Sequence, residues 1–517
     1  MKPLLILSIA FLCVSAAPRE GLANPEKPNV VIILTDDMGY ADLPMFGESE
    51  IPTSNLQRLA DTGVKLTNAH VSAPICVPSR MGLLTGRYQH RFGIYDNAYT
   101  PEENRLWVRE RTLADEFKDH GYRTANVGKW HLSGNGKPLP WLLPGPHERG
   151  FDEFVGIEGG MDDFWAGTSL LRFENGDYVS FDAPEYLTDF FGHEAAAFIE
   201  RQAGNNREPQ PSGARQTAEG SRKDEAGVPS QTKNRKPFFL YLGFNAPHAP
   251  LHSLDEDQAL IDADWISPER RIYGGMIVAI DRAVGEVLDA LEAKDLRENT
   301  LVVFLNDNGG GGNNAARHTR NTARNVPFRG HKFDLQQGGV RTPMIVSWPG
   351  TLPEGETFAG LSSSLDLFPT ALAAAGIEIP TDREIDGVNL LPFLKGEVSG
   401  DPHEFLCWQQ RQWARPNQRD PGVHMRTLHQ FAIRSGDWKA IRNDQPIATG
   451  ETEDETPARR PWELYDLSRD PGELQDVATE FPEITERLAK QFEQWQDEMH
   501  PMIERPMPAR RAPAKKQ

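Results

Sequence analysis

Three apolar runs in this chain each end directly in a cluster of polar residues. The runs are continuous rather than alternating, which is typical of strands that are buried on both faces, as in a parallel sheet. They cover residues 30–34, 238–242 and 301–305. Amphipathic helical patterns with capping or stop residues lie between them, at residues 53–63, 112–120 and 270–294. Strands that alternate with helices predict an α/β fold with a large, mostly parallel central sheet flanked by helices.

The polar clusters after these runs are expected to meet at one edge of the sheet. In open α/β sheets, ligands bind beyond the carboxyl ends of the strands. Carboxylate and amide oxygens suit a hard cation such as Ca²⁺ or Mg²⁺. Each cluster alone is most simply a helix cap or a turn, but their coincidence at one edge favours a metal site. The candidate ligands are Asp36, Asp37, Asp307 and Asn308.

The chain has only three cysteines, Cys13, Cys76 and Cys407, which excludes a disulfide framework. Cys76 stands in a Cys-x-Pro-x-Arg segment that ends at Arg80 and continues as Leu-Thr-Gly-Arg up to Arg87. A lone cysteine is more often a small buried apolar residue than a nucleophile. The extended pattern is what singles out Cys76.

This segment resembles the signature of the type I, formylglycine-dependent sulfatases, which belong to the alkaline-phosphatase-like superfamily and include secreted arylsulfatases and carbohydrate sulfatases. The resemblance covers most of residues 28–475 and extends to the segments 128–132, 246–248, 307–309 and 338–343. Two positions depart from the family pattern. Gln337 stands where Glu is usual, and Asn306 stands where Ser or Thr is commoner. We expect these departures to affect subsites rather than the metal or the nucleophile.

The resemblance implies that a formylglycine-generating enzyme oxidises Cys76 to Cα-formylglycine during maturation. The hydrated aldehyde attacks sulfur and later releases sulfate as the aldehyde reforms, which splits one difficult step into two. The resemblance also implies that residue 76 joins Asp36, Asp37, Asp307 and Asn308 in binding a divalent metal, Ca²⁺ with Mg²⁺ as the alternative.

The resemblance assigns roles to five further residues. Arg80 holds the formylglycine oxygen, and Lys129 and Lys332 neutralise the sulfate. His131 is the base that assists release of sulfate, and His248 protonates the leaving oxygen, alone or with Lys332. Near these motifs stand weaker candidates for a substrate subsite, each also readable as a solvated or packed residue: His70, His90, Arg91, His252, Asp162 and Asp163.

Three segments differ in composition from the rest of the chain: the two ends and one stretch in the middle. Residues 1–17 have the basic, apolar and small-residue pattern of a secretory signal, with cleavage expected between 16 and 24. Residues 204–236 contain no Leu, Ile, Phe, Tyr or Trp and predict a disordered insertion. We therefore expect a catalytic domain over 28–400, a small C-terminal α+β subdomain over 401–500, and a flexible basic tail over 501–517.

The formal charge of −20 argues against a nucleic-acid partner. Beyond the signal no apolar run reaches 18 residues, so no integral membrane segment is expected after processing. The sequence predicts a secreted or periplasmic sulfuric ester hydrolase that acts on sulfated carbohydrates or aryl sulfates. Two alternatives stay open: a phosphonate or phosphodiester hydrolase of the same superfamily, and a non-catalytic binder of sulfated glycans.

Overall fold

A computed structural model describes residues 27–97, 106, 109–133, 145–160, 163–204, 235–311, 313–314, 319–320, 322–414, 426–444 and 460–501. The predicted signal peptide and nearly all of the predicted insertion and of the predicted tail lie outside these residues, as do Cys13 and Asp162. None of the helices in the described part of the chain has the length and apolar character that a membrane crossing requires.

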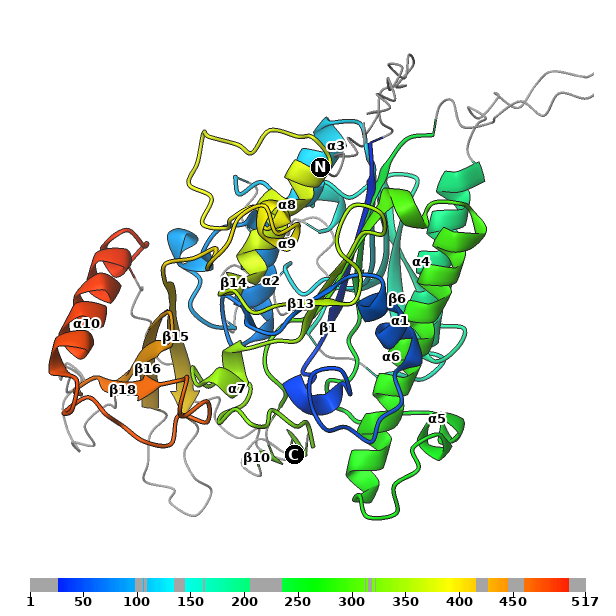
Figure 1. Cartoon of the computed structure of the whole chain (residues 1–517). Coiled ribbons are helices and arrows are strands. Elements are labelled where there is room, and N and C mark those ends of the chain that lie inside the picture. Colours follow the sequence, from blue (N-terminus) through cyan, green and yellow to red (C-terminus); the bar gives the residue numbers. More distant parts are fainter. Residues whose placement is uncertain are drawn as a thin grey trace, which may run out of the picture.

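A ten-stranded sheet forms the centre of the molecule (Figure 1), in the order β13-β2-β12-β9-β1-β8-β4-β5-β6-β7. Its five middle strands run parallel to one another. They are β9 (Thr300–Asn306), β1 (Asn29–Thr35), β8 (Phe238–Gly243), β4 (Arg123–Lys129) and β5 (Glu153–Ile157). The flanking strands are β13 (Glu356–Phe358), β2 (Val64–Leu66), β12 (Met344–Ser347), β6 (Ser169–Glu174) and β7 (Asp177–Asp182). Antiparallel pairs on both sides of the middle strands make the sheet mixed but mostly parallel, as predicted.

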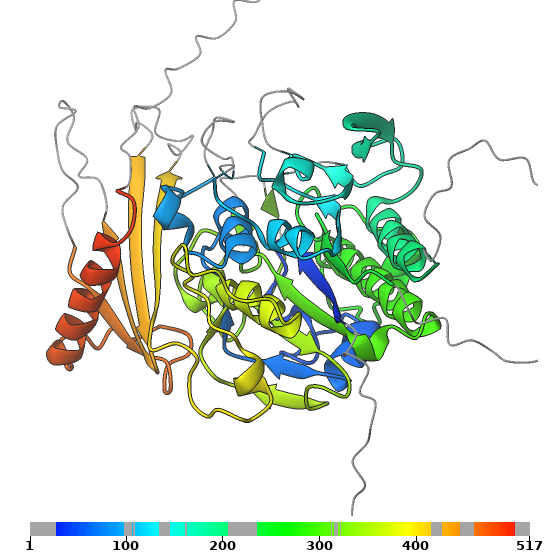
Figure 2. The same cartoon turned by 90° about the horizontal axis from the view of Figure 1, so that it is seen from above.

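Helices cover both faces of this sheet (Figure 2) because the buried strands present apolar side chains in both directions. In β1, Val31 and Ile33 face one core, and Val30, Ile32 and Leu34 face the other. The first core holds α1 (Ser54–Asp61), α4 (Leu187–Gly204) and α6 (Pro268–Ala293). The second holds α2 (Cys76–Thr85), α3 (Leu113–Asp119), α8 (Leu367–Ala374) and the short α9 (Leu391–Leu394).

A separate four-stranded antiparallel sheet follows near the C-terminus (Figures 1 and 2). It consists of β15 (Leu406–Ala414), β16 (Arg426–Ser435), β17 (Trp438–Asp444) and β18 (Glu463–Asp466). One face packs against α10 (Pro482–Asp497) through Phe431 and Ile433. The other face packs against the large domain through Ala432 and Trp408, which cluster with Val71, Leu335 and Val340. This sheet with α10 and the intervening turns is the predicted α+β subdomain, called the C-terminal subdomain below.

Candidate active site

The carboxyl ends of four neighbouring parallel strands meet at one edge of the sheet and carry the predicted catalytic residues. Asp36 and Asp37 follow β1, Lys129 ends β4, and Asp307 follows β9. His248 lies five residues beyond the end of β8. Because these strands are parallel and adjacent, side chains from four distant parts of the sequence lie at one place.

Cys76 is the first residue of α2 and is buried against this edge. Its Sγ lies 3.5 Å from Asp36 Oδ1 and 3.3 Å from Lys332 Nζ. Burial raises the pKa of the Cys76 thiol far above its usual value, and the charge of Asp36 raises it further. The unmodified side chain is therefore a neutral thiol, and a neutral thiol is a weak nucleophile.

Three carboxylates converge on Cys76. One ligand atom from each of Asp36, Asp37, Cys76 and Asp307 lies within 4.8 Å of the others, and all four residues are buried. Burial and the neighbouring charge of Asp36 raise the pKa of Asp307 to about 7. For Asp36, burial alone would raise the pKa, but the charges of Lys129, Arg80 and Lys332 hold it well below its usual range.

Asn308 completes the oxygen set. Its Nδ2 donates to Asp37 Oδ1 at 2.8 Å, whereas its Oδ1 is buried without a hydrogen-bond partner. A buried amide oxygen without a partner costs free energy unless something binds it, and a hard cation beside three carboxylates meets that need. The residues present therefore fit a divalent cation.

Three basic side chains surround the acids. Arg80 is fully buried, and its Nε donates to Asp307 Oδ2 at 3.0 Å while Nη1 donates to the Lys129 carbonyl oxygen at 3.2 Å. Lys129 contacts Asp36, and Lys332 Nζ lies 2.7 Å from Asp37 Oδ1. Three acidic side chains thus face three basic side chains. A divalent metal ion bound together with a sulfate dianion would leave the net charge of this cluster unchanged.

The two predicted histidines lie at the same edge. His248 Nδ1 is 2.6 Å from the Ala249 carbonyl oxygen, so Nδ1 carries the proton and Nε2 points to Asp37 Oδ2 at 3.5 Å. Burial and the charge of Lys332 lower the pKa of His248, which favours the neutral ring. His131 is buried two residues beyond β4 with φ of 61°, and a Cβ on Gly160 would stand 2.3 Å from its Nε2.

The weaker subsite candidates separate into two groups. His70 and His90 are fully buried: His70 contacts Gln337 and Arg434, and His90 packs against Trp495. Arg91 makes a two-pronged ion pair with Asp386. The polar atoms of these three residues make contacts between elements, and the two histidines are closed off from solvent. His252, by contrast, is partly exposed and lies 2.8 Å from Asp163.

The two departures from the family pattern also have defined places. Asn306 supports the turn after β1, since its Oδ1 accepts from Thr35 Oγ1 at 2.9 Å and from Met38 N at 3.2 Å. Gln337 is buried, and its Oε1 lies 3.0 Å from His70 Nε2 and 3.4 Å from Arg434 Nη1. Gln337 therefore belongs to the contact between the large domain and the C-terminal subdomain.

Sequence reasoning missed Gly160 and Trp165, which follow β5 and lie beside His131 and His252 respectively. No pattern in the sequence marks either residue, since their importance comes from contacts with residues far along the chain.

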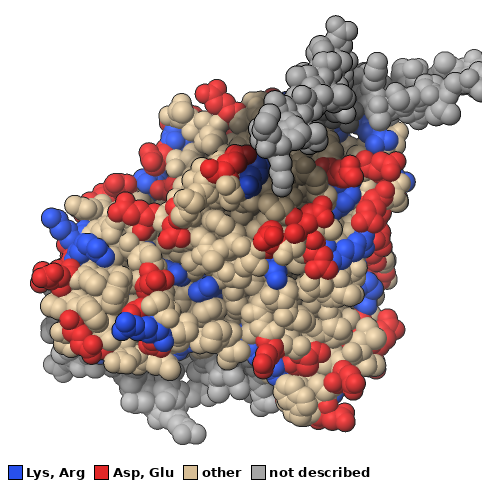
Figure 3. Space-filling view, viewed as in Figure 1, with Lys and Arg blue, Asp and Glu red and all other residues tan. Residues whose placement is uncertain are grey.

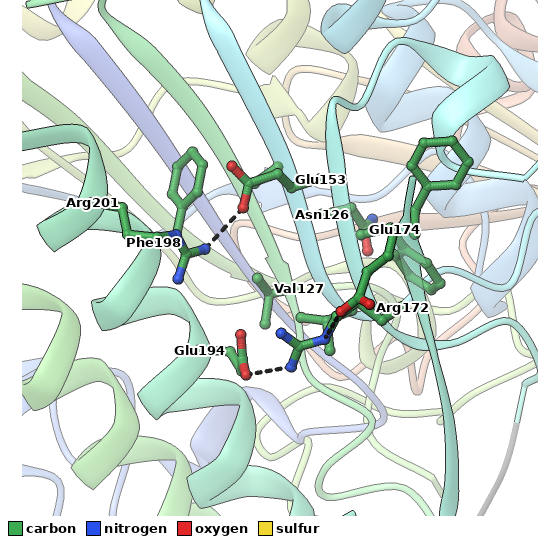
Figure 4. Close-up of a pocket in the computed structure, with 12 residues that line it drawn as sticks. Asn126, Val127, Glu153, Arg172, Glu174, Glu194, Phe198 and Arg201 are labelled. Carbon is green, nitrogen blue, oxygen red and sulfur yellow. Dashed lines mark hydrogen bonds and ion pairs between the residues drawn. The ribbon is translucent and has the colours of Figure 1, made fainter. Parts of the chain in front are cut away.

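A cavity of about 380 Å³ lies elsewhere, between α4 and strands β4, β5 and β6 (Figure 4). Arg201 pairs with Glu153 at 2.8 Å, and Arg172 pairs with Glu194 at 2.6 Å and lies 3.6 Å from Glu174, so three acids and two bases line its wall. None of the predicted catalytic residues lines it. This cavity is therefore separate from the cluster of predicted catalytic residues at the sheet edge.

Comparison with known protein families gives two matches. Residues 28–377 match the family model described as Sulfatase, and residues 331–498 match one described as N-sulphoglucosamine sulphohydrolase, C-terminal. The first covers the large sheet and its helices, and the second covers the Lys332 segment and the C-terminal subdomain.

Individual relatives align over nearly the whole chain. N-acetylgalactosamine-6-sulfatase of Canis lupus familiaris is 31% identical, and the alignment covers 95% of this chain and 90% of the relative. Arylsulfatase D of Homo sapiens is also 31% identical, with 91% and 86% covered. Among solved structures, Ps i-CgsB superposes with a TM-score of 0.72 at 29% identity, covering 92% of this chain and 94% of that one.

The family model covers residues 28–377, and the sulfatase relatives align over more than nine-tenths of this chain. The chain belongs to the sulfatase family and is an enzyme that hydrolyses sulfate esters.

Proposed function

We propose that this protein is an exported sulfatase that releases inorganic sulfate from sulfated carbohydrates, with Cys76 converted to formylglycine and Ca²⁺ bound beside it. One observation carries the proposal: Cys76 lies buried among three carboxylates and within 3.3 Å of Lys332 Nζ, at the carboxyl edge of the sheet. The family implies a metal and a formylglycine, and the side chains present fit both.

The raised pKa of Cys76 supports its conversion, because a neutral buried thiol offers no effective nucleophile. Formylglycine supplies a hydrated aldehyde whose hydroxyl attacks sulfur. Residue 76 lies at the first turn of α2, so the backbone holds its side chain at one position against Asp36.

The charge of each remaining side chain indicates its role in sulfate binding or proton transfer. Burial lowers the pKa of Lys332, but the charges of Asp37 and its neighbours outweigh this and raise the pKa above its usual value. Lys332 is therefore protonated and can bind sulfate oxygens. Lys129 shares that role, and Arg80 holds Asp307 in place. His248 presents a neutral Nε2, so it must take up a proton before it passes one to the leaving oxygen. His131 is the proposed base during sulfate release.

The choice of Ca²⁺ follows from the donors. Asp36, Asp37, Asp307 and Asn308 offer oxygen only, as Ca²⁺ prefers, and Mg²⁺ usually keeps several waters and fewer protein ligands. After chelation we expect activity and melting temperature to fall, and added Ca²⁺ to restore both at lower concentration than Mg²⁺. Restoration by Mg²⁺ alone would contradict the calcium assignment.

Two kinds of observation support a carbohydrate substrate. One relative is named for N-acetylgalactosamine 6-sulfate, and Ps i-CgsB has been solved with k-i-k-neocarrahexaose. In this chain, Trp165 is 40% exposed and stacks on His252 with ring centroids 5.4 Å apart. Asp163 lies 2.8 Å from His252. An exposed indole beside a carboxylate and an imidazole suits a sugar ring, which offers an apolar face and hydroxyl groups.

The segments that carry this surface leave the same edge of the sheet as the residues of the proposed sulfate site. Trp165 and Asp163 follow β5, and His252 follows β8, so both segments leave the catalytic edge of parallel strands. We expect Trp165→Ala to raise KM for sulfated sugars about tenfold, since one stacking contact is lost. Its inhibition constant for inorganic sulfate should be unchanged, and Trp165→Phe should restore most of the affinity. An unchanged KM in Trp165→Ala would remove the surface from the binding site.

Export rests on the composition of residues 1–17. Expression in a secreting host should yield protein outside the cytoplasm whose N-terminus lies between residues 17 and 25. Full-length protein retained in the cytoplasm would contradict export.

The experiment that tests the activity combines turnover with mass spectrometry of the Cys76 peptide. The protein, coexpressed with a formylglycine-generating enzyme, is assayed with N-acetylgalactosamine 6-sulfate, sulfated galactans, an aryl sulfate and a phosphodiester. We expect sulfate release from a sugar sulfate and the mass of formylglycine at residue 76. Faster phosphodiester turnover would favour a phosphohydrolase, and unmodified Cys76 in protein from its native host would favour a glycan binder.

A further inference from the structure

Lys439 and Glu473 form a fully buried ion pair in the C-terminal subdomain. Lys439 Nζ lies 2.9 Å from Glu473 Oε1, and both side chains are 0% exposed. Burying two charges costs free energy that their mutual attraction repays only with good geometry and further hydrogen bonds. The additional partners of this pair therefore indicate what it does.

Both members of the pair bind the same segment of the large domain. Lys439 Nζ donates to the Leu335 carbonyl oxygen at 2.5 Å, and the Gln337 backbone N–H donates to Glu473 Oε2 at 2.6 Å. The pair thus holds the backbone on both sides of Gln336, beginning three residues after Lys332.

The same segment is held from its other side by the catalytic edge. The Lys332 N–H donates to the Gly310 carbonyl oxygen at 3.1 Å, in the turn that follows the metal ligands Asp307 and Asn308. The Phe333 N–H donates to the Pro74 carbonyl oxygen at 2.9 Å, two residues before Cys76. The Lys332 segment therefore lies between the active site and the C-terminal subdomain, with hydrogen bonds to both.

The backbone at both ends of this connection is strained. Phe333 has φ of 79°, next to Lys332, and Glu473 has φ of 54°. A bulky residue rarely adopts this left-handed region, and such a conformation persists only where the surroundings hold it. Loss of the contacts at Leu335 and Gln337 would let Phe333 relax toward negative φ, and Lys332 would move with it.

We propose that Lys439 and Glu473 are positioning residues for Lys332: the C-terminal subdomain holds the strained segment 332–337 so that Lys332 Nζ stays on Asp37 and Cys76. This inference rests on the catalytic role that the proposed function gives Lys332. It assigns to the C-terminal subdomain a part in the reaction, although none of the side chains described in that subdomain belongs to the cluster at the sheet edge.

A double-mutant cycle tests the inference, with kcat/KM for the best sulfated sugar of the panel as the readout. The variant K439M/E473L removes both charges together, which avoids leaving one buried and unpaired. We expect it to lower kcat/KM about 10–100-fold, the range for a small displacement of a catalytic group. In a Lys332→Met background the same double substitution should cost less than about twofold, because its effect passes through Lys332.

Two further variants keep the result interpretable. K439M/E473Q retains an oxygen that accepts from the Gln337 N–H, so its kcat/KM should lie between those of K439M/E473L and the wild type. The matched control is D96N/R411M, which removes a buried ion pair that joins the large domain to the C-terminal subdomain, with Arg411 Nε 2.7 Å from Asp96 Oδ2. D96N/R411M should lower kcat/KM by the same factor in the wild-type background and in the Lys332→Met background.

Each outcome has a distinct meaning. Equal losses from K439M/E473L in both backgrounds would show that the pair does not act through Lys332 and would overturn the inference. A K439M/E473L enzyme with the kcat/KM of the wild type would do the same. If the effect of D96N/R411M also depended on Lys332 as strongly as that of K439M/E473L, the cause would be general loosening of the two domains. This result would also overturn the inference. Wild-type protein that releases no sulfate would overturn the proposed function itself. If K439M/E473L does not fold, K439M/E473Q carries the same comparison.

Discussion

At the scale of single residues, the catalytic edge depends on side chains whose exact shape matters. Arg80 is fully buried and reaches Asp307 and the Lys129 carbonyl oxygen at once. A lysine offers one compact ammonium group and cannot make both contacts. We expect Arg80→Lys to lower kcat/KM about 100-fold, the usual effect of removing a preorganised electrostatic contact. Steady-state kinetics of correctly modified protein check this, and a loss of less than fivefold would contradict it.

Gly160 illustrates a residue that matters only because of its neighbour. A Cβ at this position would stand 2.3 Å from His131 Nε2 and 2.4 Å from Cε1, closer than atoms can approach. Gly160 is partly exposed and the clashing atoms belong to the end of the His131 side chain, so we expect the ring to move rather than the backbone. We expect Gly160→Ala to lower kcat at least about tenfold, as for a misplaced catalytic base. The melting temperature should change little.

The corresponding control is Gly167→Ala, where the added Cβ meets no atom within 4 Å, although φ is 93°. Gly167→Ala is expected to lose some stability through its backbone and to keep its kcat. Equal kcat values for the two variants would show that His131 is not the affected group.

At the scale of elements, some boundaries follow closely from the sequence. The helix predicted over 270–294 is α6 at Pro268–Ala293, since Ser267 caps it and Pro268 suits its first turn. Helix α4 was not predicted. Its interior Gly192 suggests a break, but a Cβ there would stand 2.7 Å from Ala283 Cβ of α6. The glycine is required by close packing of two helices, which a single segment cannot reveal.

A titratable contact joins the segment before β15 to the turn before α8. His403 Nε2 lies 2.7 Å from Asp366 Oδ1. Burial lowers the pKa of His403, but the charge of Asp366 and its hydrogen bond outweigh this and raise the pKa above its usual value. A raised folded-state pKa means that this contact stabilises the protein fully below about pH 6.5, the unfolded value. The stabilisation is lost as pH rises through the folded-state pKa.

We therefore expect His403→Gln to lower the free energy of unfolding more at about pH 6 than at about pH 9, because the charged contact is lost as pH rises through the folded-state pKa. Denaturant unfolding of both proteins across this range gives the difference at each pH, in which the contributions of all other groups cancel. A difference that stays constant with pH would show that His403 is not charged in the folded protein. The comparison is made without substrate, because His403 lies outside the catalytic cluster.

At the scale of the whole molecule, the net charge of −20 opposes capture of anionic substrates. Acidic and basic side chains are interspersed on the face shown in Figure 3, so the repulsion is a long-range property of the total charge. Salt screens such repulsion, with a Debye length near 8 Å at about 0.15 M ionic strength. We expect kcat/KM for a glycan with several sulfates to rise a few fold between low salt and about 0.15 M.

A substrate with a single sulfate is the control, since its smaller charge predicts a smaller rise. A fall in kcat/KM of the polysulfated glycan with added salt would show instead that the basic side chains of the pocket dominate its capture.

The sequence by itself determined the α/β fold, the cysteine motif and the acids that end β1 and β9. These are local properties: apolar runs define buried strands, and polar residues directly after parallel strands must meet at one edge. The resemblance to sulfatases added Lys332 and His248, which no local pattern marks. Only the tertiary structure placed Lys332 3.3 Å from Cys76, 256 residues away, and joined Lys439 and Glu473 to its segment. It also removed His70 and His90 from consideration as subsite residues, because burial and hydrogen-bond partners depend on elements that meet only when the chain has folded.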